Sequence, residues 1–145
     1  MYVVDTDVIS RTSPLSREGG RVGGWLQMHV GLTFLSAATL AELRYGASRL
    51  HLRGATRQGA ALTVWIETVM SDYEGRVINM GIEVGLRTGE MLARAEKAGF
   101  DPGFADACIA ASADARGFTV VTFNSRDFTA LGVPHRPPTL EAGHR

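Results

Sequence analysis

The chain has 145 residues, of which 45% are hydrophobic, and its 15 Lys and Arg residues balance its 15 Asp and Glu residues. An apolar fraction of this size excludes an intrinsically disordered chain and fits one domain of ordinary size with its own core. The net charge of zero excludes a uniformly basic protein, so a nucleic-acid partner must bind a local basic patch.

Cysteine usage and hydropathy narrow the class of protein further. The single cysteine, Cys108, excludes an internal disulfide and lies in an apolar helical run typical of a buried core residue. Residues 1–5 lack the basic leader and the long apolar run of a signal peptide. No stretch reaches the length of a membrane span. We therefore expect a soluble, cytoplasmic protein that does not contact a membrane.

The first half of the chain alternates short apolar runs with helical patterns. Residues 2–5 are predicted to form a buried strand, and residues 11–20, rich in Ser, Pro and Gly, a loop. The predicted elements that follow are a helix at 25–30, a strand at 32–36, a helix at 39–48 and a helix at 57–70.

The second half repeats this alternation. A strand at 77–80 is followed by a helix at 83–98 that ends at Gly99. Asp101 and Pro102 have the residue types that open a helix, which we expect to run to Ala115. A fourth strand is predicted at 118–122. The polar segment after Pro134 is expected to be frayed.

Strands that alternate with helices predict an α/β fold with a small, mostly parallel sheet flanked by helices. One domain is expected over residues 1–133, followed by a polar C-terminal tail at 134–145. In such sheets ligands bind beyond the carboxyl ends of the strands. The ends of the predicted strands are therefore the places to search for a site.

Carboxylates stand near several strand ends. The candidates each carry a side-chain oxygen near a point where a strand is expected to give way to a helix or loop, and they are Asp5, Glu42, Asp106, Asp127 and Asn124. Converging acids repel one another unless a hard metal ion lies between them, and oxygen ligands suit Mg²⁺ or Mn²⁺ rather than zinc. The four histidines have no ligand spacing. The pattern predicts a magnesium-dependent enzyme that hydrolyses a phosphate-bearing substrate through metal-activated water.

Most of these acids could instead have a purely structural role. Asp5 and Asp7 are suitable helix caps. Glu42 closes a capping box with Thr39, in which the glutamate bonds back to a backbone amide. Asp106 is harder to explain in this way, because Asp101 already fills the capping role and a buried, unpaired carboxylate is costly.

The last two candidates lie on the loop after the fourth predicted strand. Asp127 has a simple alternative role as a surface ion pair with the neighbouring Arg126. Asn124 is a common turn residue that also suits hydrogen bonding to metal-bound water. Sequence alone leaves open which of the two contributes to a metal site.

Arginines form a possible nucleic-acid surface downstream of Glu42. Arg49, Arg53 and Arg57 are spaced four apart and Arg44 precedes them, so a continuous helix would place them on one basic ridge that contacts an RNA backbone. The alternative is a solvated helix face, which Gly54 favours because it weakens the helix.

Four motifs stand in order along nearly the whole chain. They read Val-Val-Asp-Thr-Asp-Val-Ile-Ser at 3–10, Ala-Ala-Thr-Leu-Ala-Glu-Leu-Arg-Tyr-Gly at 37–46, Asp-Ala-Cys-Ile-Ala-Ala-Ser-Ala at 106–113 and Val-Thr-Phe-Asn-Ser-Arg-Asp-Phe at 121–128. In this order and spacing they closely resemble the PIN-domain ribonucleases, and among these the VapC toxins of bacterial type II toxin–antitoxin systems.

The resemblance implies a three-layer PIN-like fold over residues 1–133, acids around one or two Mg²⁺ ions, endonucleolytic cleavage of RNA, a homodimer and a VapB-like antitoxin. Asp5, Glu42 and Asp106 match the core acids of the family, and either Asn124 or Asp127 matches the fourth acidic position. Two positions depart from the pattern. Asp7 stands where many members carry Asn, and Phe123 where many carry Arg.

Two alternatives to a ribonuclease toxin follow from the same residues. In a haloacid-dehalogenase-like phosphohydrolase, Asp5 of the Asp-x-Asp motif would be the covalent nucleophile. That class needs a lysine downstream, and the sole lysine, Lys97, is on a predicted helix far from any strand end. A PIN-like module that only binds a partner is the non-enzymatic alternative.

For the toxin itself, we expect the antitoxin's tail to occupy an apolar groove near Glu42. The residues expected to form this groove are Trp25, Leu26, Leu43 and Tyr45. An amphipathic helix is the form in which a disordered tail fills such a groove. An arginine on this tail would then pair with the acids.

Overall fold

The computed structural model describes residues 1–139. Within them, five strands form one sheet in the order β3-β2-β1-β4-β5, and every neighbouring pair is parallel. The strands are β1 (Tyr2–Val4), β2 (Thr33–Ser36), β3 (Val77–Ile78), β4 (Thr119–Val121) and β5 (His135–Arg136). The expected α/β fold with a small parallel sheet is confirmed.

Seven α-helices and one short 3₁₀ helix connect the strands in the described part of the chain. The helices are α1 (Thr6–Ile9), the 3₁₀ helix η1 (Ser10–Thr12), α2 (Gly19–Met28), α3 (Ala37–Leu52), α4 (Thr56–Asp72), α5 (Ile82–Lys97), α6 (Phe104–Arg116) and α7 (Ser125–Leu131). None of these helices is long and apolar enough to cross a membrane.

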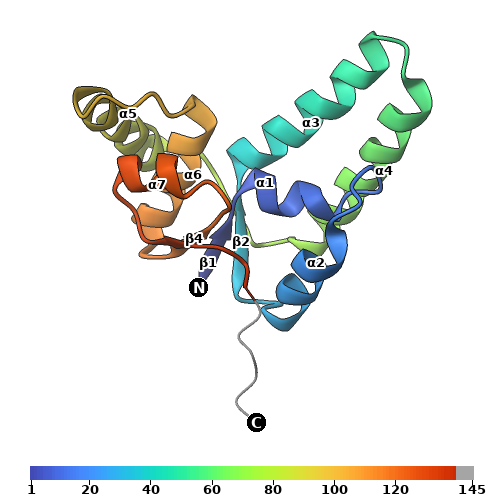
Figure 1. Cartoon of the computed structure of the whole chain (residues 1–145), viewed down its shortest axis with the longest axis horizontal. Helices are drawn as coiled ribbons and strands as arrows, with labels where there is room; N and C mark the ends of the chain where they lie inside the picture. Colours follow the sequence, from blue (N-terminus) through green and yellow to red (C-terminus); the bar gives the residue numbers. More distant parts are fainter. Residues whose placement is uncertain (140–145) are drawn as a thin grey trace.

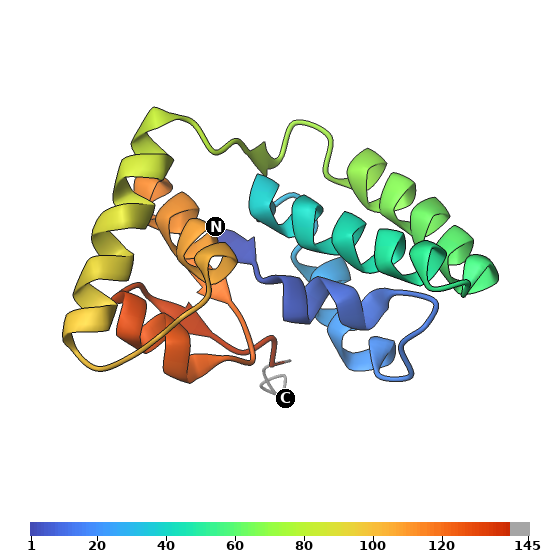
Figure 2. The ribbon, with the colours of Figure 1, turned by 90° about the horizontal axis from the view of Figure 1, so that it is seen from above.

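The sheet is the middle of three layers, because consecutive strand residues point to opposite faces. On β1, Val3 belongs to a core that it shares with residues of α5, α6 and α7, whereas Val4 belongs to a second core with residues of α1, α2, α3 and α4. Figures 1 and 2 show these two helical groups on either side of the strands. The expected three-layer arrangement is confirmed.

The four arginines at 44–57 do not lie on one continuous helix. Helix α3 ends before Arg53, and the chain reverses at Gly54, whose φ of +88° favours glycine, before α4 begins. Figure 1 shows α3 and α4 as a helical hairpin that extends away from the sheet. Arg44 and Arg49 therefore lie on one helix and Arg57 on another, so the single helical ridge is wrong.

The start of α6 also differs from expectation. Gly103, in extended conformation, is the N-cap residue and Phe104 is the first helical residue, so Asp101 does not cap the helix. Pro102 is buried, and it lies with Asp101 in the non-helical segment before Gly103. Asp106 consequently lies in the first turn of α6, where a carboxylate interacts favourably with the helix dipole.

Three boundaries near loops and the C-terminus were also missed. The expected loop at 11–20 contains η1 and the first turn of α2. His135 and Arg136 pair with β4, so the ordered sheet continues past residue 133 and the expectation of fraying from residue 134 does not hold there. This strand is too short for its two residues to give a recognisable pattern. The rest of the expected tail, 140–145, lies outside the described residues.

Candidate active site

The strand order places the site. The chain proceeds from β1 outward to β2 and β3 on one side of the sheet and returns to β4 and β5 on the other, so the order reverses between β1 and β4. Loops diverge at such a point and leave a crevice at the carboxyl ends of the strands. The Asp5 amide donates to the Val121 carbonyl across this junction, at 2.9 Å.

Asp5 is the most buried acid of the group, with 3% of its surface exposed. Its Oδ1 accepts a hydrogen bond from the Thr6 amide at 2.7 Å, so it caps α1, and its Oδ2 accepts one from the Thr122 hydroxyl at 2.7 Å. Burial, with the charge of Asp7 as the next cause, raises the pKa of Asp5 to about 8. Asp5 therefore caps α1 and also lies among the other acids at this edge of the sheet.

Asp7 belongs to the same cluster, although its residue type and position predicted only a cap. Its Oδ2 accepts a hydrogen bond from the Phe123 amide at 3.2 Å. Its Oδ1 is buried and has no hydrogen-bond partner within residues 1–139. Burial raises the pKa of Asp7, while the neighbouring carboxyl group of Asp5, the Phe123 amide and the charge of Arg11, in that order, oppose the rise. The signal for this residue was the Asp-x-Asp spacing at the end of β1.

Glu42 reaches the cluster from α3, but not as part of a capping box. Helix α3 begins at Ala37 with Ser36 as its N-cap, whose hydroxyl accepts from the Ala38 amide at 3.2 Å. The Thr6 hydroxyl instead donates to Glu42 Oε1 at 2.7 Å, and it also lies 3.0 Å from the hydroxyl of the buried Thr39. The predicted box is wrong, and Glu42 is an exposed carboxylate held toward α1.

Asp106 completes the convergence from α6. It is half-buried, and burial is the main cause that raises its pKa to about 6. The charges of three other carboxylates raise it further, in the order Glu42, Asp127 and Asp7. Acids from four separate segments of the chain therefore act on one another electrostatically at this edge of the sheet.

Asn124 and Asp127 form a reciprocal pair at the start of α7. The Asn124 Oδ1 accepts from the Asp127 amide at 3.3 Å, and the Asn124 Nδ2 donates to Asp127 Oδ2 at 2.8 Å. The Asn124 amide donates to the hydroxyl of Thr122, which itself contacts Asp5. The suggested ion pair of Asp127 with Arg126 is absent from the described residues, where Arg126 lies against Phe100 instead.

Among residues 1–139, no cationic side chain forms an ion pair with these acids. The side chains as placed do not bring three His, Cys, Asp or Glu groups of the described chain close enough to enclose an ion. The unpartnered oxygen of Asp7 and the raised pKa values of Asp5 and Asp106 nevertheless fit an all-oxygen site for a hard divalent cation.

The expected apolar groove is largely wrong. Trp25 and Leu43 are buried in the core and line no surface. Tyr45 is 64% exposed and lines a hollow beside Glu42, together with Met80 and Phe104. Leu26 lines a different hollow, against α4. The sequence did not show which of these apolar side chains are buried in the core, as Leu43 is, and which are exposed on α3, as Tyr45 is.

Comparison with known proteins places the chain in a family. The PIN-domain profile matches residues 2–133. This chain belongs to the PIN-domain family. A VapC ribonuclease, Y4jK of Sinorhizobium fredii, is 32% identical over 138 residues, which cover 92% of this chain and 94% of that protein. The plasmid stability protein StbB of Pseudomonas syringae pv. tomato is 33% identical over 135 residues, with the same coverage.

A solved structure gives the same result for the PIN domain as a whole. The crystal structure of FitAcB from Neisseria gonorrhoeae superposes with a TM-score of 0.81 at 30% identity and covers 95% of this chain and 98% of its own. The resemblance to PIN-domain proteins of the VapC type, drawn from four motifs, is therefore confirmed. The match to residues 2–133 contains every acid of the cluster.

Proposed function

We propose that this PIN-domain protein is a divalent-metal-dependent endoribonuclease that acts as the VapC-like toxin of a type II toxin–antitoxin system. The observation that carries the proposal is the convergence of Asp5, Glu42 and Asp106, with Asp7 and Asp127, at the carboxyl ends of β1 and β4. Membership of the PIN-domain family and the similarity to a VapC ribonuclease support the choice of RNA.

The residues fit Mg²⁺, for which Mn²⁺ can substitute. Asp5 and Asp106 are the proposed direct ligands with Glu42, while Asp127 is an outer ligand and Asn124 acts through water. When bound, the ion offsets negative charge on the phosphate and lowers the pKa of water. Asp7, with its free buried oxygen, is an additional ligand candidate that the sequence alone did not include.

Side chains of the protein orient the carboxylates and accept the proton of the attacking water. The hydroxyls of Thr6 and Thr122 fix the directions of Glu42 and Asp5 through hydrogen bonds. Glu42 is the exposed carboxylate of the set, so we assign it the removal of a proton from the attacking water. Asp127 is held in place by its two hydrogen bonds with Asn124.

The direct test is cleavage of single-stranded RNA by the purified full chain. Wild-type protein should cleave RNA in Mg²⁺ or Mn²⁺, and EDTA should stop the reaction. Asp106→Asn should lower the rate by about 10²–10³-fold, because the variant loses a ligand charge for the metal ion that offsets negative charge on the phosphate. The exposed Arg94→Gln on α5 is the matched control and should cleave normally. Wild-type activity in the Asp106→Asn variant would contradict the assignment.

Two alternatives to a ribonuclease are a haloacid-dehalogenase-like phosphohydrolase and a module that only binds a partner. Family membership decides against the haloacid-dehalogenase-like phosphohydrolase, and both carboxylate oxygens of Asp5 accept hydrogen bonds in a buried setting that suits a ligand. A module that only binds a partner would show no metal-dependent cleavage with all acids intact.

The proposed function also implies an antitoxin, a homodimer and a location in the cytoplasm. A VapB-like antitoxin would silence the enzyme by placing a cation against the uncompensated acids. A second copy of the chain is proposed to cover the exposed apolar hollow lined by Tyr45, Met80 and Phe104, as a homodimer. A ribonuclease that slows the growth of its own host must meet RNA in the cytoplasm.

A further inference from the structure

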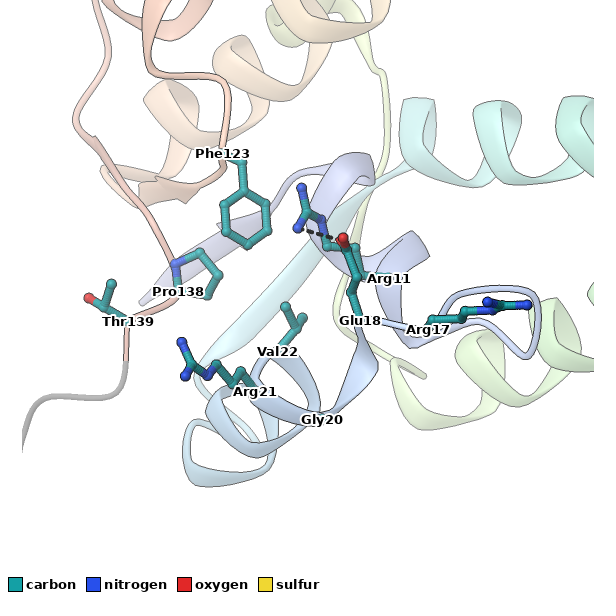
Figure 3. A pocket seen from close by; sticks show the side chains of 9 residues that line it. All are labelled: Arg11, Arg17, Glu18, Gly20, Arg21, Val22, Phe123, Pro138 and Thr139. Carbon is teal, nitrogen blue, oxygen red and sulfur yellow. Dashed lines mark hydrogen bonds and ion pairs between the residues drawn. The ribbon is translucent and has the colours of Figure 1, made fainter.

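A separate pocket lies beside the acid cluster and carries the opposite charge. Figure 3 shows it between η1 and α2 on one side and Phe123 and Pro138 on the other. Three arginines contribute to its lining, namely Arg11, Arg17 and Arg21. Arg17 and Arg21 are exposed, and neither forms an ion pair within residues 1–139. In Figure 3, Arg21 extends toward Pro138, whereas Arg17 points away at the rim.

An exposed aromatic ring stands opposite these cations. Phe123 is 41% exposed, and the Arg11 guanidinium lies 3.9 Å from the centre of its ring. This stacked contact leaves part of the ring accessible to a second planar group. Glu18, the one acid of the lining, is paired with Arg11 at 2.8 Å, so its charge is balanced locally. The pocket therefore offers a cationic wall and a flat apolar surface.

The pocket is joined to the acid cluster through the backbone of Phe123. The Phe123 amide donates to Asp7 Oδ2 at 3.2 Å, while the Phe123 ring lines the pocket. The charge of Arg11 reaches Asp7 as well, because it opposes the rise of that residue's pKa. A ligand in the pocket therefore lies next to the acids that are assigned to phosphodiester cleavage.

We propose that this pocket is the subsite for the RNA nucleotide that flanks the scissile phosphate. The base stacks on the accessible part of Phe123, and the adjacent phosphate binds Arg21. This proposal rests on the proposed ribonuclease function. An arginine binds phosphate through paired N–H donors, and aromatic stacking accepts any base, so the subsite favours unpaired RNA without selecting its sequence.

An acidic peptide is the other ligand that three arginines can attract. The exposed aromatic ring and its direct attachment to the acid cluster favour a nucleotide, because a peptide carboxylate makes no use of a stacking surface. The arginines of the α3–α4 hairpin are a weaker surface for RNA near the cut, since they lie on two helices and Arg49 is turned toward Tyr45.

The test is equilibrium binding of a fluorescent single-stranded RNA of about ten nucleotides, followed by anisotropy. Each protein is the full chain with Asp106→Asn, in EDTA, so that binding is measured without cleavage. Phe123→Leu keeps an apolar side chain but removes stacking, and it should weaken binding about ten-fold. Phe123→Tyr keeps the ring and should bind like the parent. Thermal melting of each variant confirms that it is folded.

Arg21→Gln tests the phosphate contact. It should weaken binding and lower the slope of log affinity against log salt by about 0.7, the value for one phosphate contact on a single strand. Arg94→Gln on α5 removes the same charge far from the pocket and should leave the slope unchanged. A general effect of net charge would move both variants equally, and that result would overturn the subsite.

The outcomes separate the subsite from the proposed function. If wild-type protein cleaves RNA in Mg²⁺ but Phe123→Leu and Arg21→Gln bind RNA like Arg94→Gln, only the subsite is wrong. If these two variants lose the antitoxin but keep RNA, the pocket belongs to a protein partner and the proposal fails. If wild-type protein neither binds nor cleaves RNA, the subsite and the proposed function fall together.

Discussion

The two halves of the acid cluster are held in different ways. Asp5 and Asp7 follow β1, are largely enclosed, and receive hydrogen bonds from backbone amides and a buried threonine. Glu42 projects from the second turn of α3 and is exposed, whereas Asp106 projects from the first turn of α6 and is half-buried. From this difference we expect both halves to contribute to metal binding, the strand-end half to have the larger effect on stability, and Glu42 to act mainly in proton transfer.

The largest effect that we expect is a loss of RNA cleavage when the exposed Glu42 is changed. Glu42→Gln keeps the hydrogen bond from the Thr6 hydroxyl but loses the charge needed to accept a proton. RNA cleavage in Mg²⁺ should fall by about 10²-fold, within the range for a lost general base, while the melting temperature stays the same. A large fall in melting temperature would show that Glu42 has a structural role instead, and unchanged cleavage would remove it from the catalytic set.

For the enclosed half, Asp5 and Asp7, we expect the stability of the fold to depend on pH. Because Asp5 has its pKa raised from 3.8 to about 8, the folded chain holds a proton that the unfolded chain releases in this interval. The free energy of unfolding should therefore fall as pH rises from about 4 to about 8 when EDTA removes metal. Asp106, with a pKa of about 6, adds to the lower part of the decline.

Melting temperatures in EDTA between pH 5 and pH 8 provide the measurement. The wild-type melting temperature should decrease with pH more steeply than that of Asp5→Asn, which has no carboxyl group to ionise at this position. Added Mg²⁺ should raise the wild-type value most at the alkaline end. Parallel curves for the two proteins would show that the charge of Asp5 is not suppressed by its surroundings.

The sequence predicted the parts of the fold that depend on local patterns. Alternating apolar runs and helical spacing located β1, β2, β3 and β4, because each is a short buried run between polar turns. Strand β5 has only His135 and Arg136 and gives no such pattern. The start of α6 was misplaced because Asp101 and Pro102 have the residue types of a helix start, whereas the chain stays non-helical through Gly103 and the helix begins at Phe104.

The sequence suggested which acids to consider for the candidate site, but not the hydrogen bonds that hold them. Asp5 was a candidate because it follows an apolar strand and Asp106 because it precedes an apolar helical run, and the fold raises the pKa of each. The bond between Thr122 and Asp5 joins residues 117 positions apart, and no local pattern encodes it. Asp7 was underrated because its residue type suits a cap, and only the fold shows that one of its oxygens lacks a partner among residues 1–139.

Binding of Mn²⁺ to the full chain, followed by the loss of its free electron paramagnetic resonance signal, tests the central claim most directly. If the two halves of the cluster share one cation site, Asp5→Asn and Asp106→Asn should each weaken Mn²⁺ binding by at least about ten-fold, because each removes one ligand charge. The exposed Asp101→Asn, which lies outside the cluster, should bind like wild type. Equal Mn²⁺ binding by all four proteins would contradict a shared metal site.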